Sequence, residues 1–345
     1  MYEKHIIEDR VTVLEALGRL NDLSGGTLVL FVVNDDGRMV GTLTDGDIRR
    51  YLLGGGRLDD NVRLAMKRDY IFVRGSISLE QVRSCRKERI NLVPCLDDEG
   101  RICSVYDFNT HKSFLPLDAV LMAGGKGERM RPLTLETPKP LLPVGGKAII
   151  DYNVERLIAN GVEDIYVTVN YLHEQIETHF SQPVQNVTVH CVQEPEFLGT
   201  IGSIKYIPEF RNDTVLLMNS DLFTNIDFED FYSHFVQYDA DMSVATFPFA
   251  VNIPYGIFEL EGREIRGIKE KPLYNYHANA GIYLLRKEVL DMIPSGVPYH
   301  ATDLIEALVA AGKRVIRFPI TGYWIDIGKP EDYRKAEELV KHLKF

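Results

Sequence analysis

Short apolar runs alternate with longer stretches of mixed polarity along the last two thirds of the chain. This pattern predicts strands at 119–123, 164–169 and 187–192, and helices at 149–161 and 173–180. Strands that alternate with helices in this way form a largely parallel, doubly wound sheet. We therefore predict an α/β fold for this part of the chain, with ligands bound beyond the carboxyl ends of the strands.

The first third of the chain carries one hydrophobic pattern twice. A helical pattern at 13–20 leads to an apolar strand at 28–33, then to a polar turn, a second strand and a helix beginning near Asp47. A similar order recurs over residues 78–107. Because 345 residues exceed the usual size of one core, we predict two domains, at residues 1–114 and 115–345.

The first repeat contains the segment GTLTDGD at residues 41–47, and the sequence AMKR at 65–68 lies between the repeats. These segments resemble a tandem pair of CBS domains, also called a Bateman module. The resemblance implies a smaller α/β domain in which Thr44 and Asp47 hold the ribose of a regulatory nucleotide. A Thr or Asp before a helix also commonly caps free backbone N–H groups, so helix capping remains an alternative role.

A glycine-rich segment, GGKGERMRPLT at residues 124–134, follows the strand predicted at 119–123. Glycines after a strand allow a tight turn that brings backbone N–H groups against phosphate oxygens. Downstream, Lys139 stands between two prolines, which hold it on a stiff, extended segment. Arg129 and Lys139 are therefore predicted to point two cations at one polyanion.

The combined pattern of residues 124–140 resembles the signature of the sugar-1-phosphate nucleotidyltransferases, a family with a Rossmann-like α/β fold and a mixed, mostly parallel sheet. The resemblance implies that Arg129 and Lys139 are catalytic and steady the triphosphate and the leaving pyrophosphate. It also implies a set of nucleotide-binding residues in the turn: Ala123, Gly124, Gly125 and Gly127.

A second turn, QEPEFLGT at residues 193–200, follows the strand predicted at 187–192. In the family, the equivalent turn lies against the base and ribose, which implies nucleotide-binding roles for Gln193, Gly199 and Thr200. An ordinary strand-to-helix turn is the alternative interpretation.

Two aspartates are candidate metal ligands. Asp221 follows an apolar strand pattern at 215–219, and a carboxylate at the carboxyl end of a strand is well placed to hold Mg²⁺. Asp326, in the segment YWIDIGKP, matches the second metal-binding aspartate of the family. Capping of a helix beginning near Pro330 is an alternative role for Asp326. We expect Mg²⁺ as the cofactor.

The segment KEKP at residues 269–272 resembles a sugar-site motif of the same family. The resemblance implies that Lys271 is catalytic and neutralises the sugar phosphate. It also implies sugar contacts from Tyr255, Gly256, Glu270 and Asn279. Taken alone, the alternating charges at 269–271 are equally typical of a solvated hairpin.

The charge of the chain argues against nucleic acid as a partner. The formal net charge is −11, and residues 117–345 carry 22 Lys and Arg against 32 Asp and Glu, so a phosphate backbone would be repelled. No apolar run reaches the length of a membrane span, and four scattered cysteines suit a reducing compartment. We expect a cytoplasmic homo-oligomer with no membrane partner, acting on small molecules.

These observations predict a reaction in which a nucleoside triphosphate and a sugar 1-phosphate give an NDP-sugar and pyrophosphate. CBS repeats joined to such a transferase resemble the guanylyltransferases that make GDP-sugars for surface glycans and nonulosonic acids. The resemblance favours GTP with a hexosamine, mannose or heptose 1-phosphate, and a regulatory nucleotide in the first domain. Uridylyl, cytidylyl or thymidylyl transfer is an alternative within the family.

Two functions of other classes remain. A nucleotide-sensing protein with an inactive transferase half would keep the fold and lose turnover. A dinucleotide oxidoreductase would need a Gly-x-Gly-x-x-Gly turn with an acidic residue some twenty positions later, and this chain lacks that pattern.

Overall fold

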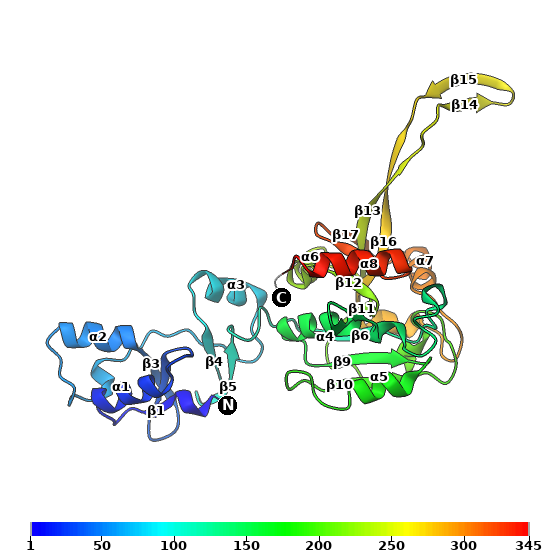
Figure 1. Cartoon of the computed structure of the whole chain (residues 1–345). Coiled ribbons are helices and arrows are strands. Elements are labelled where there is room, and N and C mark those ends of the chain that lie inside the picture. The colour runs from blue at the N-terminus through cyan, green and yellow to red at the C-terminus, as the bar shows by residue number, and fades with distance from the viewer. Residues whose placement is uncertain (1, 344–345) are drawn as a thin grey trace. The chain divides into compact units, whose positions relative to one another are not determined.

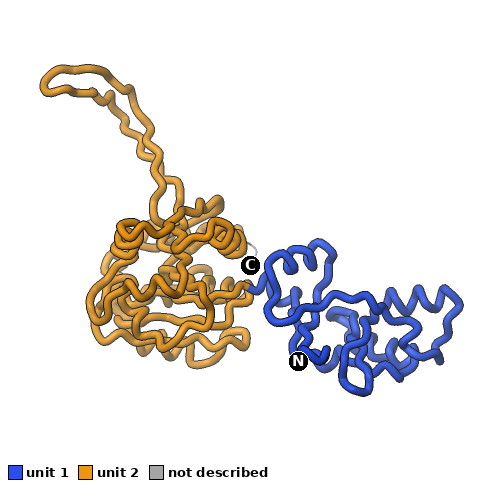
Figure 2. Tube along the Cα trace, turned by 180° about the vertical axis from the view of Figure 1, so that it is seen from behind, with its two compact units in different colours: residues 1–114 blue, residues 115–345 orange. Residues whose placement is uncertain are grey.

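Separate clusters of buried apolar side chains lie before and after residue 114. The computed structural model describes residues 2–343. Its contacts divide the chain into two units, Met1–Phe114 and Leu115–Phe345, drawn blue and orange in Figure 2. We describe each unit by itself.

Unit 1 contains two unequal repeats. The elements of the first are β1 (Ile6–Glu8), α1 (Val13–Asp22), β2 (Val29–Val33), β3 (Met39–Thr44) and α2 (Asp45–Leu53). Those of the second are α3 (Leu79–Lys87), β4 (Leu92–Leu96) and β5 (Ile102–Asp107), and two short 3-10 helices are η1 (Glu3–His5) and η2 (Val62–Leu64). The first repeat forms a three-stranded sheet and the second a two-stranded sheet. One cluster of buried side chains belongs to both repeats, namely Phe31, Met39, Leu92 and Leu96.

Thr44 and Asp47 cap helix α2. The N–H of Thr44 donates to Oδ2 of Asp47 over 2.9 Å, and the N–H of Asp47 donates to Oγ1 of Thr44 over 3.2 Å. The hydroxyl of Thr44 also donates to the same carboxylate oxygen, over 2.6 Å. This reciprocal capping box satisfies free donors of the first turn. The capping role is therefore observed, and ribose binding by these two residues stays a prediction.

Unit 2 is built on a seven-stranded sheet with strand order β10-β9-β6-β11-β16-β13-β17. The strands are β6 (Asp118–Met122), β9 (Ile165–Val169), β10 (Val189–Gln193), β11 (Thr214–Asn219), β13 (Met242–Asn252), β16 (Leu273–Arg286) and β17 (Val315–Pro319). Only β16 runs antiparallel to its neighbours in this sheet. The predicted α/β fold with a mixed, mostly parallel sheet is confirmed.

Helices connect and cover these strands. They are α4 (Ile149–Ala159), α5 (His173–His179), α6 (Phe228–Gln237), α7 (Ala301–Ala310) and α8 (Pro330–Val340), with 3-10 helices η3 (Glu128–Met130), η4 (Lys139–Leu141), η5 (Gly202–Tyr206) and η6 (Lys287–Met292). Among residues 2–343, no helix has both the length and the apolarity that crossing a bilayer requires. A short pair, β7 (Pro143–Val144) and β8 (Lys147–Ala148), precedes α4.

Two strand pairings determine where chemistry can occur. Strands β6 and β11 are parallel neighbours, and Asn219 lies opposite Met122 at their carboxyl ends. The segments that follow these two strands therefore leave the sheet side by side. In addition, β12 (Leu222–Thr224) pairs with β18 (Trp324–Asp326), which brings a late segment of the chain to the same edge.

Strands β13 and β16 continue beyond the sheet as a two-stranded ribbon (Figure 1). The ribbon ends in a hairpin of β14 (Ile257–Glu261) and β15 (Glu264–Lys269). Figures 1 and 2 both show this segment projecting from the rest of unit 2. We call residues 249–276 the arm.

Candidate functional site

The glycine turn after β6 is packed too closely for side chains at its start. A Cβ atom on Gly124 would collide with Oε1 of Glu194. The turn then enters η3, from which Arg129 extends, and a Cβ of Gly127 would lie 3.2 Å from Cβ of Lys139. The turn thus lies against the segment that carries the proline-flanked lysine.

Glu194 supports two loops at once, and the sequence did not identify it as a site residue. Its side chain is buried, Oε2 accepts the N–H of Leu198 over 3.0 Å, and Oε1 lies against Gly124. Burial raises the pKa of this carboxyl, and the N–H of Leu198 lowers it. Its position, directly after the strand predicted at 187–192, was the available signal.

Lys139 lies between two carboxylates. Its ammonium donates to Oδ2 of Asp221 and lies 3.7 Å from Oδ1 of Asp326. The lysine side chain is almost fully buried, and the preceding Pro138 has extended backbone angles. A rigid segment therefore holds one cation between two acids that come from different strands.

The two acids meet because β12 and β18 are paired. Asp326 lies opposite Leu222, the residue that follows Asp221. Burial raises the pKa of Asp326, and the nearby charge of Asp221 raises it further, while Lys139 and Arg129 lower it. Oδ1 of Asp221 is buried and has no hydrogen-bond partner among residues 2–343.

Buried polar groups hold the segment around Asp221 in place. The N–H and the hydroxyl of Ser220 both donate to the carbonyl oxygen of Met122, over 3.2 and 2.7 Å. On the other side, Nδ2 of Asn153 in α4 donates to the carbonyl oxygen of Leu222 over 2.9 Å. Asp221 is therefore fixed between β6 and α4.

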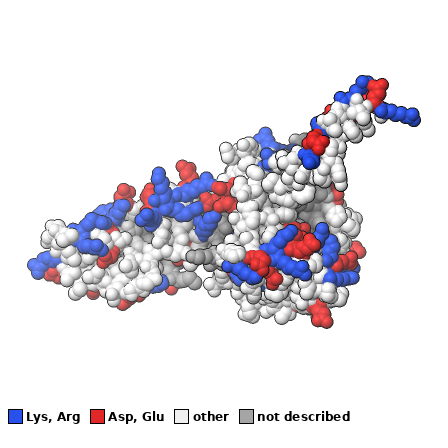
Figure 3. All heavy atoms as spheres, turned by 45° about the horizontal axis from the view of Figure 1, so that its top comes forward, with Lys and Arg blue, Asp and Glu red and all other residues white. Residues whose placement is uncertain are grey.

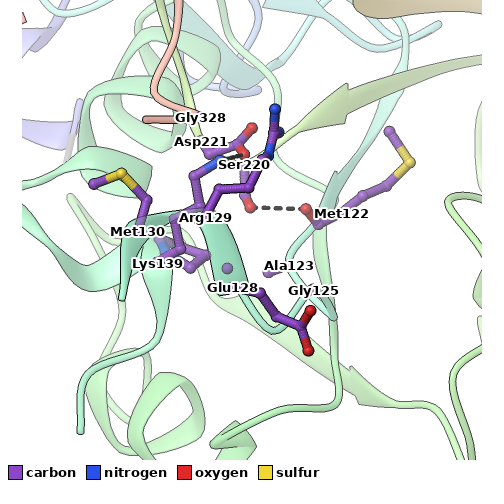
Figure 4. A pocket seen from close by; sticks show the side chains of 12 residues that line it. Met122, Ala123, Gly125, Glu128, Arg129, Met130, Lys139, Ser220, Asp221 and Gly328 are labelled. Carbon is purple, nitrogen blue, oxygen red and sulfur yellow. Dashed lines mark hydrogen bonds and ion pairs between the residues drawn. The ribbon is translucent and has the colours of Figure 1, made fainter. Parts of the chain in front are cut away.

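These residues surround a cavity of about 340 Å³ at the carboxyl ends of β6 and β11. Its lining includes Ala123, Gly125, Gly127, Arg129, Lys139 and Asp221. Figure 4 shows Lys139 meeting Asp221, Ser220 bonded to Met122, and Glu128 pointing away from both pairs. A second hollow of the same volume adjoins it, since Arg129 and Gly328 line both, and Asp326 lines the second.

The two carboxylates fit a divalent cation that is shared with a phosphate ligand. Mg²⁺ in phosphate-binding sites takes one or two carboxylates and completes its shell with water and substrate oxygens. Within the described range 2–343, no group of three or more His, Cys, Asp and Glu side chains is arranged to hold a metal. Asp221 and Asp326 could therefore supply only part of the ligand shell of a cation. Oxygen atoms of water and of a phosphate ligand would have to complete it.

The turn at 193–200 is held by its neighbours. Gly199 has φ +77°, and a Cβ there would lie 2.6 Å from the carbonyl oxygen of Tyr299, so glycine is required. The hydroxyl of Thr200 accepts the N–H of Ala301 at the start of α7. Gln193 ends β10, with Nε2 lying 3.1 Å from Nε2 of His173.

Four of the five predicted sugar-site residues lie on the arm, namely Tyr255, Gly256, Glu270 and Lys271. None of them is among the residues that line the cavity at Lys139 and Asp221. The reason is that β13 and β16 remain paired beyond the sheet and carry these residues outward (Figure 1). The fifth, Asn279, lies within β16, where Nδ2 donates to the hydroxyl of Tyr283 and Oδ1 accepts the N–H of Gly281.

Comparisons with known proteins identify the families that this chain matches. The model of a nucleotidyl transferase family matches residues 118–342, and that of the CBS domain matches residues 6–54. A putative mannose-1-phosphate guanyltransferase of Sulfolobus acidocaldarius is 31% identical over 234 residues, which are 66% of this chain and 64% of that protein. A D-glycero-alpha-D-manno-heptose 1-phosphate guanylyltransferase of Aneurinibacillus thermoaerophilus is 29% identical over 66% of this chain and 99% of its own length.

Among solved structures, HddC from Yersinia pseudotuberculosis is 27% identical, with a TM-score of 0.51, over 65% of this chain and 99% of that one. A second structure of HddC, complexed with GMP-PN, matches with a TM-score of 0.50 at the same identity and coverage. The chain spans 64% of the length of the Sulfolobus acidocaldarius protein, which is slightly less than two thirds.

Removing the buried charge of Glu194 tests its structural role. Because burial raises the pKa of Glu194 in the folded chain, its ionised form opposes folding at neutral pH, and this effect fades as the pH falls through the folded pKa. Glu194→Gln keeps an oxygen that can accept the N–H of Leu198. Its free energy of unfolding should therefore exceed that of wild type at pH 7. This difference should shrink as the pH falls towards about 4. Urea unfolding followed by the fluorescence of Trp324, the single tryptophan, measures this margin.

The matched control is Glu196→Gln, which removes the same charge two residues away at an exposed position. Its stability relative to wild type should change little with pH. A margin for Glu194→Gln that grows on acidification would contradict the assignment.

Proposed function

The chain belongs to the nucleotidyl transferase family through residues 118–342, and on this basis we propose that it joins a nucleoside triphosphate to a sugar 1-phosphate, releasing pyrophosphate. The observation that carries the proposal is the ammonium of Lys139 lying between Asp221 and Asp326, beside a glycine turn. This arrangement suits a polyanion that arrives with a divalent cation.

The reaction brings two anions together, so its barrier is largely electrostatic. Positioning and charge stabilisation are the main contributions of a protein to such phosphoryl chemistry. In our proposal the N–H groups of residues 124–127 and the cations Arg129 and Lys139 hold the triphosphate and stabilise the leaving pyrophosphate. The attacking phosphate is already ionised near neutral pH, so no general base and no covalent intermediate are needed.

Asp221 and Asp326 would hold Mg²⁺, which would supply positive charge to offset the negative charge that develops on the phosphates. In the chain alone, the single positive charge of Lys139 offsets part of the charge of these two carboxylates. The unpartnered Oδ1 of Asp221 supports a further ligand at this position.

The relatives favour guanylyl transfer. Two of them are named as guanylyltransferases of mannose 1-phosphate and of a heptose 1-phosphate, and HddC has been solved with GMP-PN. We propose GTP as the nucleotide and a mannose, heptose or hexosamine 1-phosphate as the acceptor. Uridylyl, cytidylyl or thymidylyl transfer is the alternative within the family.

Unit 1 offers a separate ligand site. A cavity of about 670 Å³ lies between its two repeats, lined by Lys4, His5 and Thr27 from one side and by Asn91, Asp107 and Asn109 from the other. Such a volume, with a cation and several hydrogen-bonding groups, suits a mononucleotide. We propose this cavity as the place where a regulatory nucleotide binds. Thr44 and Asp47, which already bond to one another, are not among its lining residues.

A matrix of four nucleoside triphosphates against several sugar 1-phosphates tests the reaction. We expect NDP-sugar to form fastest with GTP, to disappear when EDTA removes divalent cations, and to return with excess Mg²⁺. Product should be measured directly by anion-exchange chromatography, because a coupled pyrophosphatase would itself need the metal. No product from any pair would refute the reaction, and product formed equally well in EDTA would refute the metal.

Asp221→Asn tests the acidic pair while preserving shape. The amide can still accept a hydrogen bond from Lys139 but cannot neutralise a cation, so we expect kcat to fall by about 10²-fold or more. Asp291→Asn is the control, since it makes the same change on a highly exposed side chain and should leave kcat unchanged. Near-normal turnover by a folded Asp221→Asn variant would refute the assignment.

The unit 1 cavity can be separated from the capping box by two substitutions in the full chain. Lys4→Ala, at an exposed position on the cavity lining, should weaken the binding of ATP or GTP, whichever the wild type binds, by about tenfold, which corresponds to 1.4 kcal/mol. Thr44→Ala should leave that affinity unchanged and destabilise the fold by about 1 kcal/mol, through loss of the cap. Isothermal titration measures the affinities, and the reverse pattern would place the nucleotide at Thr44.

A further inference from the structure

The arm exposes an apolar surface along a ribbon that pairs with no other strand among residues 115–343. After Thr246, the paired residues of β13 lie opposite β16 alone, from Phe247 with Ala278 to Asn252 with Leu273. Beyond this ladder, the hairpin of β14 and β15 forms its own two-stranded sheet. The large apolar side chains exposed on the arm are Phe249, Val251, Tyr255, Phe258, Leu260, Ile265, Ile268, Leu273 and Tyr276.

The hairpin has one apolar face and one charged face. Directly opposite residues point to the same side of a sheet, and the register pairs Phe258 with Ile268 and Leu260 with Ile265. All four of these side chains are more than half exposed. On the other face, Lys269 forms an ion pair with Glu259 over 2.6 Å.

A free hairpin of this kind is poorly stabilised in water. An isolated two-stranded hairpin is marginally stable at best and needs a packed face. Burying large apolar side chains stabilises a structure, and the face of the hairpin leaves four of them uncovered. The exposed apolar side chains of the arm are therefore typical of a protein interface.

The body of the same chain is poorly placed to provide that cover. The ladder of β13 and β16 continues unbroken from Thr246 to Asn252, and the N–H of Ile253 donates to the carbonyl oxygen of Pro272 just beyond it. Folding the arm back on its own pocket would break these hydrogen bonds. The arm can contact another molecule without breaking the hydrogen bonds between β13 and β16.

Charge favours a second copy of this chain as the other molecule. Residues 249–276 contain four Asp and Glu and four Lys and Arg, and both signs are interspersed along the arm in Figure 3. The body of unit 2 is strongly acidic, so a neutral arm can approach it where an acidic one would be repelled. A basic or acidic macromolecule would find no charged surface to match on the arm.

Two loops, one of which adjoins pocket-lining residues in the sequence, carry exposed apolar side chains, which we call the apolar rim. Leu133 and Leu135 follow the glycine turn, Phe197 lies in the turn at 193–200, and all three are substantially exposed. These two loops are joined through Glu194. The apolar face of the hairpin and the apolar rim are both uncovered in the single chain.

We propose that two copies of this chain exchange arms, so that the hairpin of each lies on the apolar rim of the other and carries Lys271 to the pocket of that copy. The shared site rests on the proposed function, since Lys271 is the predicted sugar-phosphate ligand. Exchange about a two-fold axis gives a closed dimer in which each copy provides one arm and receives one. It also accounts for the placement of Glu270 and Lys271 at the base of the hairpin, outside their own pocket.

Sedimentation velocity tests the arm interface without reference to activity. Wild type should be a dimer at micromolar concentration, and Ile265→Asp should raise the dissociation constant at least about tenfold. Val309→Asp is the matched control, since Ile265 and Val309 are each 60% exposed and Val309 lies on α7; it should stay dimeric. A monomeric wild type, or an equal effect of both variants, would overturn the proposal.

Mixed dimers test the shared site. Asp221→Asn removes an acid from one pocket and Lys271→Ala removes the cation from one arm, so each variant alone should be inactive. Co-expressed, they should recover about a quarter of wild-type activity, because half the dimers are mixed and each of these has one complete site. No recovery from dimers shown to be mixed would overturn the sharing of Lys271.

A photo-crosslinker at position 271 gives a readout that does not depend on turnover. In a mixture of isotopically labelled and unlabelled chains, it should attach to residues 123–139 of the other copy. Links confined to a single copy would refute arm exchange even if the enzyme is active, and links between copies would support it even if the proposed reaction fails.

Discussion

The requirement to neutralise two neighbouring, partly buried carboxylates underlies the rest of unit 2. Asp221 and Asp326 lie close together because β12 and β18 are paired, and the charge of Asp221 makes ionisation of Asp326 less favourable. Isolated carboxylates in such a place would be costly. Lys139 supplies the compensating charge in the chain itself, and a metal-bound triphosphate would supply it during the proposed reaction.

Buried side chains around Lys139, Asp221 and Asp326 hold the segments that carry them in place. Ser220 ties the end of β11 to β6, Asn153 holds the strand that follows Asp221, and Glu194 joins the glycine turn to the turn at 193–200. Each uses a buried hydrogen bond to a backbone group, which positions the chain without entering the reaction. A site assembled on strand ends and supported in this way is preorganised for charge stabilisation.

The arm and the unit 1 cavity extend the same chain beyond this centre. The arm is an outgrowth of the central sheet, so whatever covers its apolar face is coupled mechanically to β13 and β16. The cavity in unit 1 lies between two repeats that share buried side chains. Catalytic, assembling and regulatory functions would thus occupy three separate surfaces, each with its own physical test.

The sequence by itself determined the elements and the local backbone chemistry. Hydrophobic period predicted β6, β9, β10, β11, α4 and α5 to within about two residues, because burial of one face imposes that period. Glycines and prolines marked the turns, because their effect on φ is local. Only the tertiary structure decided that Asp326 meets Asp221, that Glu194 supports Gly124, that Thr44 and Asp47 bond to one another, and that Lys271 leaves its own pocket. These outcomes depend on strand register and burial between distant segments, which no local pattern encodes.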